Sequence, residues 1–143
     1  MPPVYLLVAI LGMIALHYLF PVRQLIEGPW RWAGLGLIVA GVGLVVWVAR
    51  IFKKRSTTIR PGDVSSRLVT DGPFRISRNP IYLGMVCVLA GIAIALGSLT
   101  PWLVIPVFIG VLTRNIIPVE EQMLEEAFGE DYLRYRATVR RWI

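Results

Sequence analysis

The sequence contains little of what metal sites and disulfides require. Its 143 residues include one cysteine, Cys87, and one histidine, His17. A single cysteine excludes an intrachain disulfide and a cysteine-cluster metal site, and a single histidine excludes a site built from several histidines. Both residues lie in apolar stretches, where we expect them to be buried and neutral. We therefore predict no metal in the functional site.

Acidic residues are also few. The chain has nine of them against fifteen basic residues, and most of the nine lie between Glu120 and Asp131. The apolar stretches contain none, which argues against a small transporter, since such proteins use acidic groups near the middle of the membrane. No nucleic-acid-binding motif accompanies the basic surplus, so we expect these residues to lie beside a membrane surface.

Long apolar runs dominate the chain. Apolar residues make up 56% of it and form unbroken blocks instead of amphipathic periods. We therefore predict a single all-α polytopic membrane domain with four transmembrane helices, at about residues 4–20, 32–52, 80–97 and 101–117. The first span is near the shortest length that crosses a bilayer, and in an alternative topology it lies partly in the interface.

The connections between the spans differ in charge. Residues 53–80 form a basic loop that includes Arg55, Arg60 and Arg67, whereas the connection at residues 98–100 is uncharged. Basic loops are retained on the cytoplasmic side of a membrane. We therefore predict that this loop, both termini and the functional site face the cytoplasm.

Residues 81–118 are predicted to form a helical hairpin. The turn is short, and Thr100 can cap a helix whose first residue is Pro101. The far ends of the two helices, at residues 80–84 and 114–121, must then lie close together. Every inference about the site depends on this proximity.

Other residues bear on helix packing and helix ends. Pro106 should kink or open the fourth span. Four glycines of the second span permit close helix approach: Gly34, Gly36, Gly41 and Gly43. Residues 119–143 are predicted to form cytoplasmic helices, broken at Gly129, whose basic end would meet anionic headgroups. The second of these helices has an apolar stripe at helical spacing, made of Tyr132, Tyr135, Val139 and Trp142.

Residues 78–84 combine groups that suit an anionic ligand. Asn79 and Pro80 fit the N-cap and the first position of a helix. The unpaired N–H groups of a helix start attract a carboxylate, and Arg78 and Tyr82 would surround the same point. Gly84 leaves room for a ligand or a neighbouring helix. Each residue alone has a structural explanation, but their joint spacing favours a binding site.

Charged residues at the end of the fourth span should face this motif. Arg114 would lie at headgroup depth, where it could snorkel to the interface or hold an anionic acceptor. Glu120 and Glu121 follow in the first turn of the tail helix, where acidic groups also stabilise the helix dipole. Two adjacent acidic residues at a basic membrane surface indicate that at least one binds a ligand, through ribose hydroxyls or a cationic group.

Two segments have a familiar pattern. Residues 71–84 read DGPFRISRNPIYLG, and residues 120–140 contain Glu-Glu-x-x-Leu, then Phe-Gly and two tyrosines. They resemble the two signature blocks of the isoprenylcysteine carboxyl methyltransferase and phospholipid methyltransferase superfamily, whose first block is Gly, aromatic, Arg, then Arg-His/Asn-Pro-x-Tyr-x-Gly. The resemblance covers residues 57–143, and the order of both blocks around one hairpin makes it specific.

The resemblance implies an enzyme that binds S-adenosylmethionine without a Rossmann domain, and the chain has no Gly-rich strand-to-helix turn. It implies a cofactor pocket lined by Arg78, Asn79, Pro80, Tyr82, Leu83 and Gly84. Glu120 or Glu121 would hold the ribose or amino end of the cofactor. Arg114 and Glu121 are the candidate catalytic residues, with Arg114 orienting the acceptor.

Asn79 stands where many family members have histidine. Asparagine can hydrogen-bond the cofactor but does not titrate near neutrality, which disfavours a general base here. The cofactor carries an activated methyl group, so the protein mainly aligns the reactants. A carboxylate acceptor needs no base, whereas an amine must lose a proton. This favours a carboxylate or thiol acceptor, and we expect a lipidic or prenylated acceptor of the isoprenylcysteine-carboxylate kind.

Other functions stay open from the sequence. Phosphatidylethanolamine N-methylation, with a glutamate as base, is the main alternative. A membrane reductase of the sterol-reducing type would be expected to have a longer chain. A four-helix transporter or scaffold is the non-enzyme alternative. Four short spans could also need a second copy of the chain to enclose a lipid tail, so a homo-oligomer is considered as well.

Overall fold

The computed structural model describes residues 2–54 and 68–143. These residues are mostly helical, and their only β-type pairing is an isolated bridge between Gln24 and Ser98. Arg55, Arg60 and Arg67 of the predicted basic loop lie outside the described residues. The predicted all-α class is confirmed.

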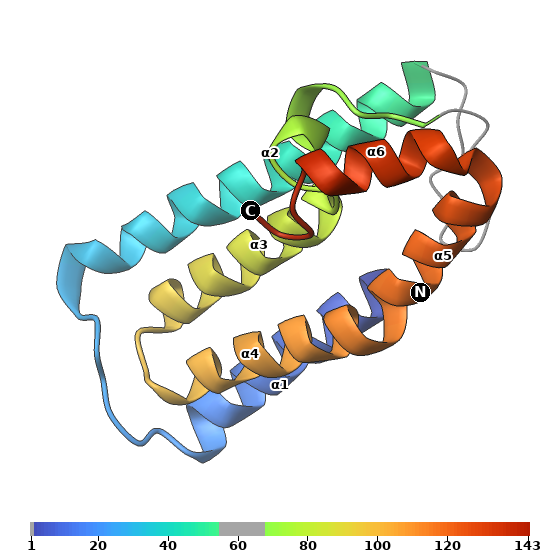
Figure 1. Ribbon diagram of the computed structural model, residues 1–143. Coiled ribbons are helices and arrows are strands. Elements are labelled where there is room, and N and C mark those ends of the chain that lie inside the picture. Colours follow the sequence, from blue (N-terminus) through green and yellow to red (C-terminus); the bar gives the residue numbers. More distant parts are fainter. Residues whose placement is uncertain (1, 55–67) are drawn as a thin grey trace.

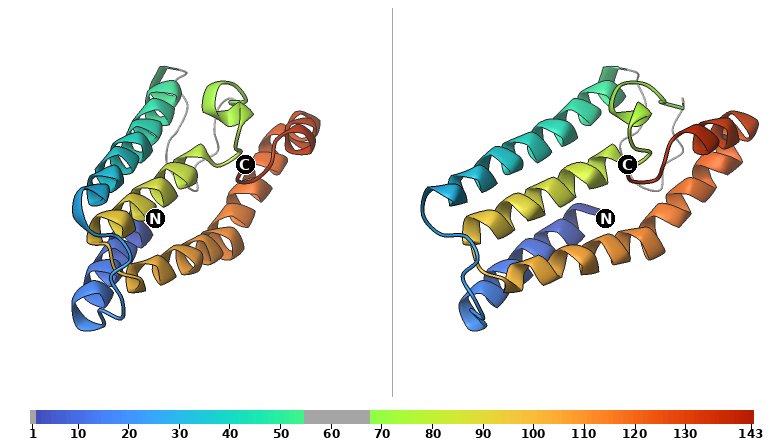
Figure 2. Two further views of the ribbon diagram at one scale, coloured as in Figure 1. Left: turned by 90° about the vertical axis from the view of Figure 1, so that its left-hand side faces the viewer. Right: turned by 60° about the vertical axis from the view of Figure 1, so that its left-hand side comes forward.

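Four apolar helical rods lie side by side (Figures 1 and 2). The first three are α1 (Pro2–Leu19), α2 (Trp32–Lys54) and α3 (Pro80–Leu96), and the fourth comprises residues Thr100–Phe128. Three helices in the described ranges are long and apolar enough to cross a membrane: Pro2–Leu19, Gly28–Lys54 and Thr100–Phe128. The helix α3 is also apolar but has 17 residues. The polytopic membrane architecture is confirmed with three candidate spans, and the crossing of the membrane by α3 stays a prediction.

The closest helix contact joins α2 to α3 through two pairs of glycines. Gly34 faces Gly91, and Gly41 faces Gly84. A Cβ atom at Gly41 would lie 2.5 Å from the carbonyl oxygen of Gly84, so a side chain does not fit between the two backbones. The predicted close approach is confirmed for two of the four glycines in α2. It is wrong for the two that have nothing within 4 Å of a Cβ position: Gly36 and Gly43.

At one end of the bundle, the connection before α2 is bonded to the connection after α3. The backbone N–H of Leu25 donates to the carbonyl of Gly97 at 2.7 Å, and that of Leu99 donates to the carbonyl of Arg23 at 2.9 Å. Gly97 has a φ of +78°, which side-chain-bearing residues rarely adopt. These bonds hold the start of α2 beside the end of α3.

The same end of the bundle is tied to α1. The hydroxyl of Ser98 lies 2.7 Å from Nδ1 of His17, and the Thr100 hydroxyl donates to the carbonyl of Leu16 at 3.2 Å. The predicted capping role of Thr100 is therefore wrong, because its hydroxyl bonds a different helix and makes no cap bond. His17 has a structural bond here, far along the bundle from the predicted site.

The fourth rod is continuous but irregular. It consists of η3 (Thr100–Leu103), α4 (Val104–Val111), η4 (Leu112–Ile116) and α5 (Ile117–Phe128). In the π-helical turn η4, the N–H of Ile117 donates to the carbonyl of Leu112. This turn ends two residues before Pro118, which has no N–H to donate, and the rod changes direction here (Figure 1). The predicted opening at Pro106 is wrong, since Pro106 lies in regular α-helix. The helical rod continues past residue 117, and the predicted end of the membrane span there stays a prediction.

The rod and α3 form the predicted hairpin, but they are splayed. Residues 97–99 connect them, α3 packs mainly on α2, and α1 lies against both α3 and α4. The far ends of the hairpin nevertheless meet, since the Tyr82 hydroxyl and the Glu120 carboxylate are 2.6 Å apart. The proximity on which the site prediction depends is confirmed.

A break at Gly129 separates α5 from α6 (Glu130–Thr138), as predicted. Gly129 has a φ of +50°, a conformation that favours glycine. Beyond the break, α6 lies over the short helix η2 (Gly72–Arg75), where Tyr132 and Tyr135 pack in one cluster with Val48 and Phe74. This cluster fixes α6 beside the start of α3 (Figure 1).

Candidate active site at the start of α3

The site begins where η2 leads into α3. Asn79 holds the N-cap position and Pro80 is the first helical residue, as predicted. The Asn79 side chain makes no cap bond; its amide donates to the backbone carbonyl of Arg141 at 3.0 Å. The Ser77 hydroxyl donates to the same carbonyl at 3.2 Å. The prediction that the Asn79 side chain caps α3 is therefore wrong, because its amide donates to a backbone carbonyl in the segment after α6.

Two arginines share the carboxylate of Glu121. Arg141 makes a bidentate contact, with Nε 3.0 Å from Oε1 and Nη2 2.6 Å from Oε2. Nη1 of Arg78 lies 3.2 Å from Oε1. The side chains of Arg78 and Glu121 are only 10% and 8% exposed, so the Glu121 charge is stabilised chiefly by the two arginines and little by water. The hydrogen bond to Glu121 raises the pKa of Arg141 above its ordinary value.

A further bond joins α3 to α5. The hydroxyl of Tyr82 donates to Oε1 of Glu120 at 2.6 Å. Tyr82 is buried, whereas Glu120 is partly exposed. Oε2 of Glu120 has no hydrogen bond with another described residue and can accept one from a ligand. Glu120 therefore has the more available carboxylate, while both oxygens of Glu121 are bound by arginine.

Tyrosines of α6 close the site on the side of η2. The Tyr135 hydroxyl donates to the carbonyl of Phe74 at 2.7 Å, and Nη1 of Arg78 donates to the Tyr132 hydroxyl at 3.4 Å. Burial raises the pKa of both tyrosines, so both are neutral at physiological pH. These bonds attach α6 to the loop that carries the Arg78 motif.

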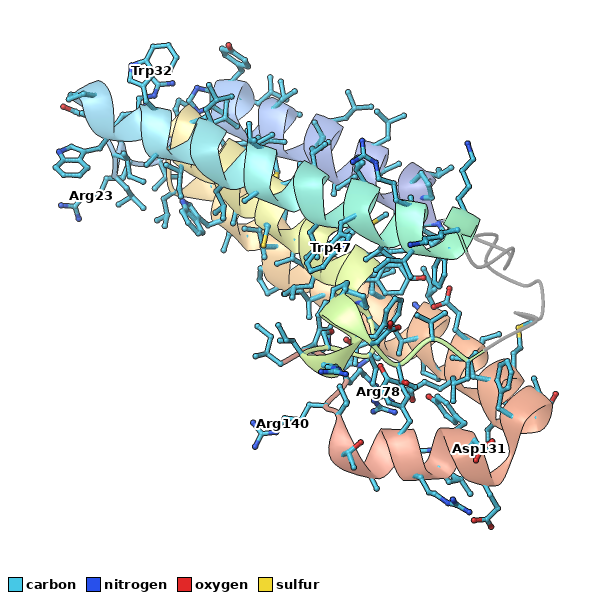
Figure 3. The ribbon with its side chains drawn as sticks, turned by 90° about the horizontal axis from the view of Figure 1, so that it is seen from above. Arg23, Trp32, Trp47, Arg78, Asp131 and Arg140 are labelled. Atoms are coloured by element: carbon cyan, nitrogen blue, oxygen red, sulfur yellow. The ribbon has the colours of Figure 1, made fainter. Side chains whose placement is uncertain are left out.

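The segment after α6 turns back toward the start of α3 (Figure 1). The backbone N–H of Arg78 donates to the carbonyl of Arg140 at 3.0 Å. The indole Nε1 of Trp142 donates to the Thr113 hydroxyl, in η4, at 3.2 Å. Figure 3 shows Arg78 between the start of α3 and α6, whereas Arg140 points away from the molecule. The returning segment thus bridges the two halves of the site.

Together these groups form a corner that attracts anions. Nε of Arg78 is buried and has no hydrogen-bond partner among the described residues. A buried donor without an acceptor costs roughly 1–3 kcal/mol, which a bound acceptor would offset. The start of α3 also favours a carboxylate. With Glu120 beside them, these donors fit a small ligand that carries a carboxylate at one end and hydroxyl or cationic groups at the other.

A metal site is not part of this arrangement. In residues 2–54 and 68–143, no cluster of three or more histidine, cysteine, aspartate or glutamate residues could hold a metal ion. The corner presents arginine, tyrosine and glutamate side chains, which can bind and align charged organic groups.

Residues 29–131 match the phospholipid methyltransferase family. The chain belongs to this family. It is also similar to a protein described as uncharacterized from Haemophilus influenzae, with 38% identity over 63 residues, which are 44% of this chain and all of that protein. No solved structure matches the chain. As a member of the phospholipid methyltransferase family, the protein is a membrane methyltransferase, and enzymes of this family generally use S-adenosylmethionine.

The region that matches the phospholipid methyltransferase family contains both halves of the corner. It includes Arg78 and Tyr82 at the start of α3 and Glu120 and Glu121 in α5. It ends ten residues before Arg141. The arginine that binds both oxygens of Glu121 therefore lies outside the matched region.

Two of the predicted site residues, Gly84 and Arg114, do not converge on this corner. Gly84 faces α2, where the backbone of Gly41 takes the space beside it, so the helix-packing interpretation holds for this residue. Leu83 is partly buried in α3, and its place in the pocket stays a prediction. Arg114 is exposed in η4 and forms no hydrogen bond or ion pair with another described residue. The residues that the structure does bring together are Arg78, Asn79, Tyr82, Glu120 and Glu121.

Arg141 was missed because the tail has several basic residues and spacing does not distinguish the one that folds back. Helical spacing placed Val139 and Trp142 on the second tail helix, but that helix ends at Thr138. The residues after Thr138 are therefore free to return to the site. The residues after Tyr135 are too few to show from sequence alone in which direction the chain continues.

Proposed function

We propose that the protein transfers the methyl group of S-adenosylmethionine to a carboxylate on a lipidic or prenylated acceptor of the isoprenylcysteine kind. The observation that supports this proposal is the meeting of two distant segments at one corner. Arg78 contacts Glu121 at 3.2 Å, and Tyr82 donates to Glu120 at 2.6 Å. A site built from both segments can hold the two ends of one cofactor.

The residues present suit the groups of this cofactor. Arg78 and the N–H groups at the start of α3 suit its carboxylate. Glu120, held by Tyr82, suits the ribose hydroxyls or the cationic end. The adjoining wall would come from Asn79, Pro80 and Leu83. The cofactor supplies an activated methyl group, so these residues have to bind it, align it and exclude water.

A carboxylate acceptor fits the corner because no proton has to be removed from it. His17, the single histidine, is bonded to Ser98 at the other end of the bundle and cannot act here. Arg114 is exposed in η4, where it could pair with an anionic acceptor and orient it. Glu121 would contribute through the arginines that it holds.

Phospholipid amine methylation is the second candidate. The family match favours it. The available oxygen of Glu120 could also take the proton that an amine loses. The two acceptors give different products, since a carboxylate becomes a methyl ester and an amine becomes an N-methyl amine.

The difference between these products provides the test. Purified protein in mixed lipid micelles is incubated with radiolabelled S-adenosylmethionine and either a prenylated cysteine derivative or phosphatidylethanolamine. Alkali releases labelled methanol from a methyl ester but leaves an N-methyl group intact. We expect alkali-labile label with the prenylated acceptor. Alkali-stable label in the phospholipid would establish the second candidate.

A matched pair of variants connects the product to the site. We expect Glu120→Gln to lower the rate about tenfold or more. Glu125→Gln removes the same charge from an exposed position of the same helix and should leave the rate unchanged. A folded wild-type protein that labels neither acceptor would contradict the methyltransferase proposal and favour a scaffold role.

We extend the proposal to topology and assembly. The corner should face the cytoplasm, since the basic loop precedes it directly. In a Cys87→Ser background, a cysteine at exposed position 140 should react with an impermeant maleimide only after the cells are opened. Reaction in intact cells would contradict this orientation. A second copy of the chain would help enclose the acceptor's lipid tail. The mass of the solubilised complex measures how many copies it contains.

A further inference from the structure

Glu121 is bound by its two arginines unequally. Arg141 takes both carboxylate oxygens, at 3.0 and 2.6 Å. Arg78 contacts one oxygen through Nη1 at 3.2 Å, and its Nε has no partner in the described part of the chain. Arg78 therefore has hydrogen-bonding capacity that Glu121 does not use.

The bidentate contact decides which way the carboxylate faces. A carboxylate beside a single guanidinium favours two parallel hydrogen bonds to it. While Arg141 fixes the plane of the Glu121 carboxylate, only one oxygen of that carboxylate contacts Arg78. Without Arg141, the carboxylate could turn and bind Arg78 with both oxygens. The N–H groups of Arg78 would then bond Glu121 and would not be available to a ligand.

The backbone holds Arg141 in place independently of its side chain. The Arg141 carbonyl accepts hydrogen bonds from Asn79 at 3.0 Å and from Ser77 at 3.2 Å. The next residue, Trp142, is bonded to Thr113. A substitution of the Arg141 side chain should therefore leave the returning segment docked, which allows the role of the guanidinium to be measured separately.

We propose that Arg141 is a positioning residue: by chelating Glu121, it keeps the Arg78 guanidinium available for the carboxylate of the cofactor. This inference rests on the proposed function, in which that cofactor is S-adenosylmethionine. Arg141 does not touch the reacting atoms. Its loss should therefore weaken cofactor binding more than it slows the reaction at saturating cofactor.

The test measures the Kd of S-adenosylmethionine by calorimetry on the whole protein in detergent. We expect Arg141→Gln to raise the Kd about tenfold or more. Arg141→Lys should raise it less, since an ammonium keeps the charge but cannot fix the carboxylate plane. Arg140→Gln removes the same charge from the neighbouring exposed side chain and should change the Kd by less than about twofold.

Each other outcome has a definite meaning. A Kd for Arg141→Gln within about twofold of the wild type would overturn the inference and leave the proposed function standing. Equal losses in Arg141→Gln and Arg140→Gln would also overturn it, because net charge would explain both. A fall in kcat as large as the rise in Kd would assign Arg141 a general structural role instead. A folded wild type that binds no cofactor would contradict the proposed function itself.

Thermal unfolding without cofactor checks that each variant is folded. If Arg141→Gln fails to fold, the comparison rests on Arg141→Lys against the wild type. A Kd for Arg141→Lys equal to that of the wild type would then overturn the inference, since charge without bidentate geometry would suffice.

Discussion

The hydroxyl of Tyr82 and the carboxylate of Glu120 are 2.6 Å apart, although 38 residues separate them in the chain. The ion pair between Arg78, in the segment just before α3, and Glu121 of α5 lies beside this hydrogen bond. Two adjacent contacts fix both the spacing and the orientation of the helix ends. The start of α3 and the start of α5 therefore behave as one site.

Tyr82→Phe removes the hydroxyl and keeps the ring. We expect the free energy of unfolding to fall by about 1.5–3 kcal/mol, because a hydrogen bond to a charged group is lost. The rate of methyl transfer should fall about tenfold, since Glu120 is no longer held in position. Denaturant titration and the labelled-methyl assay measure the two effects. A wild-type rate in a folded variant would show that this bond does not position Glu120 for the reaction.

Removing the shared carboxylate should cost more stability than removing either of its arginines. Glu121→Gln leaves two guanidinium groups without compensation, and we expect a loss of about 3–5 kcal/mol. Arg78→Gln leaves Glu121 paired with Arg141, and we expect a loss of about 1–2 kcal/mol. The free energies of unfolding of the two variants are compared under the same conditions. The reverse order would contradict the sharing of one carboxylate by two arginines.

Gly41→Ala should destabilise the packing of α2 on α3. The added Cβ would lie 2.5 Å from the carbonyl oxygen of Gly84, so the helices must separate, at a cost of about 1–3 kcal/mol or more. Gly43→Ala is the matched control on the same helix, because nothing lies within 4 Å of its Cβ position. It should be neutral or stabilise the helix by up to about 1 kcal/mol. Equal unfolding temperatures for the two variants would show that the glycine contact is unimportant.

The attachment of α6 should weaken in alkali. Burial raises the pKa of Tyr135 above its unfolded value of about 10. The stability that its neutral hydroxyl contributes is fully present below about pH 10 and is lost as the pH rises toward the folded pKa. Unfolding temperatures at about pH 8 and about pH 10.5 measure the loss. Tyr135→Phe should be less stable at the lower pH but lose less on going to the higher one; an equal loss in both proteins would rule out this tyrosine as the cause.

Features with a local physical cause were predictable from the sequence. The apolar runs indicated the helices, Pro80 marked the start of α3 and Gly129 marked the break before α6. The meeting of Tyr82 with Glu120 followed from topology, because a short turn between two helices predicted to have similar lengths brings their far ends together. No knowledge of individual side-chain contacts was needed for these predictions.

Features that depend on tertiary contacts were not predictable. The face of α2 that meets α3 is set by its partner, so Gly34 and Gly36 could not be distinguished by sequence alone. The Asn79 amide and the Thr100 hydroxyl bond distant backbone carbonyls in place of the nearby helix ends. The contact of Arg141 with Glu121 crosses a helix break and a reversal of the chain, and neither has a periodic signal.

The most direct test of the shared site is the calorimetric binding of S-adenosylmethionine to variants of each half. Arg78→Gln alters the start of α3, Glu120→Gln alters α5, and Glu125→Gln is the exposed control. If both segments hold one cofactor, the wild type and the control bind it with the same Kd, and each of the other variants binds about tenfold more weakly or worse. Equal binding by all four folded proteins, or none by the wild type, would contradict a cofactor site between α3 and α5.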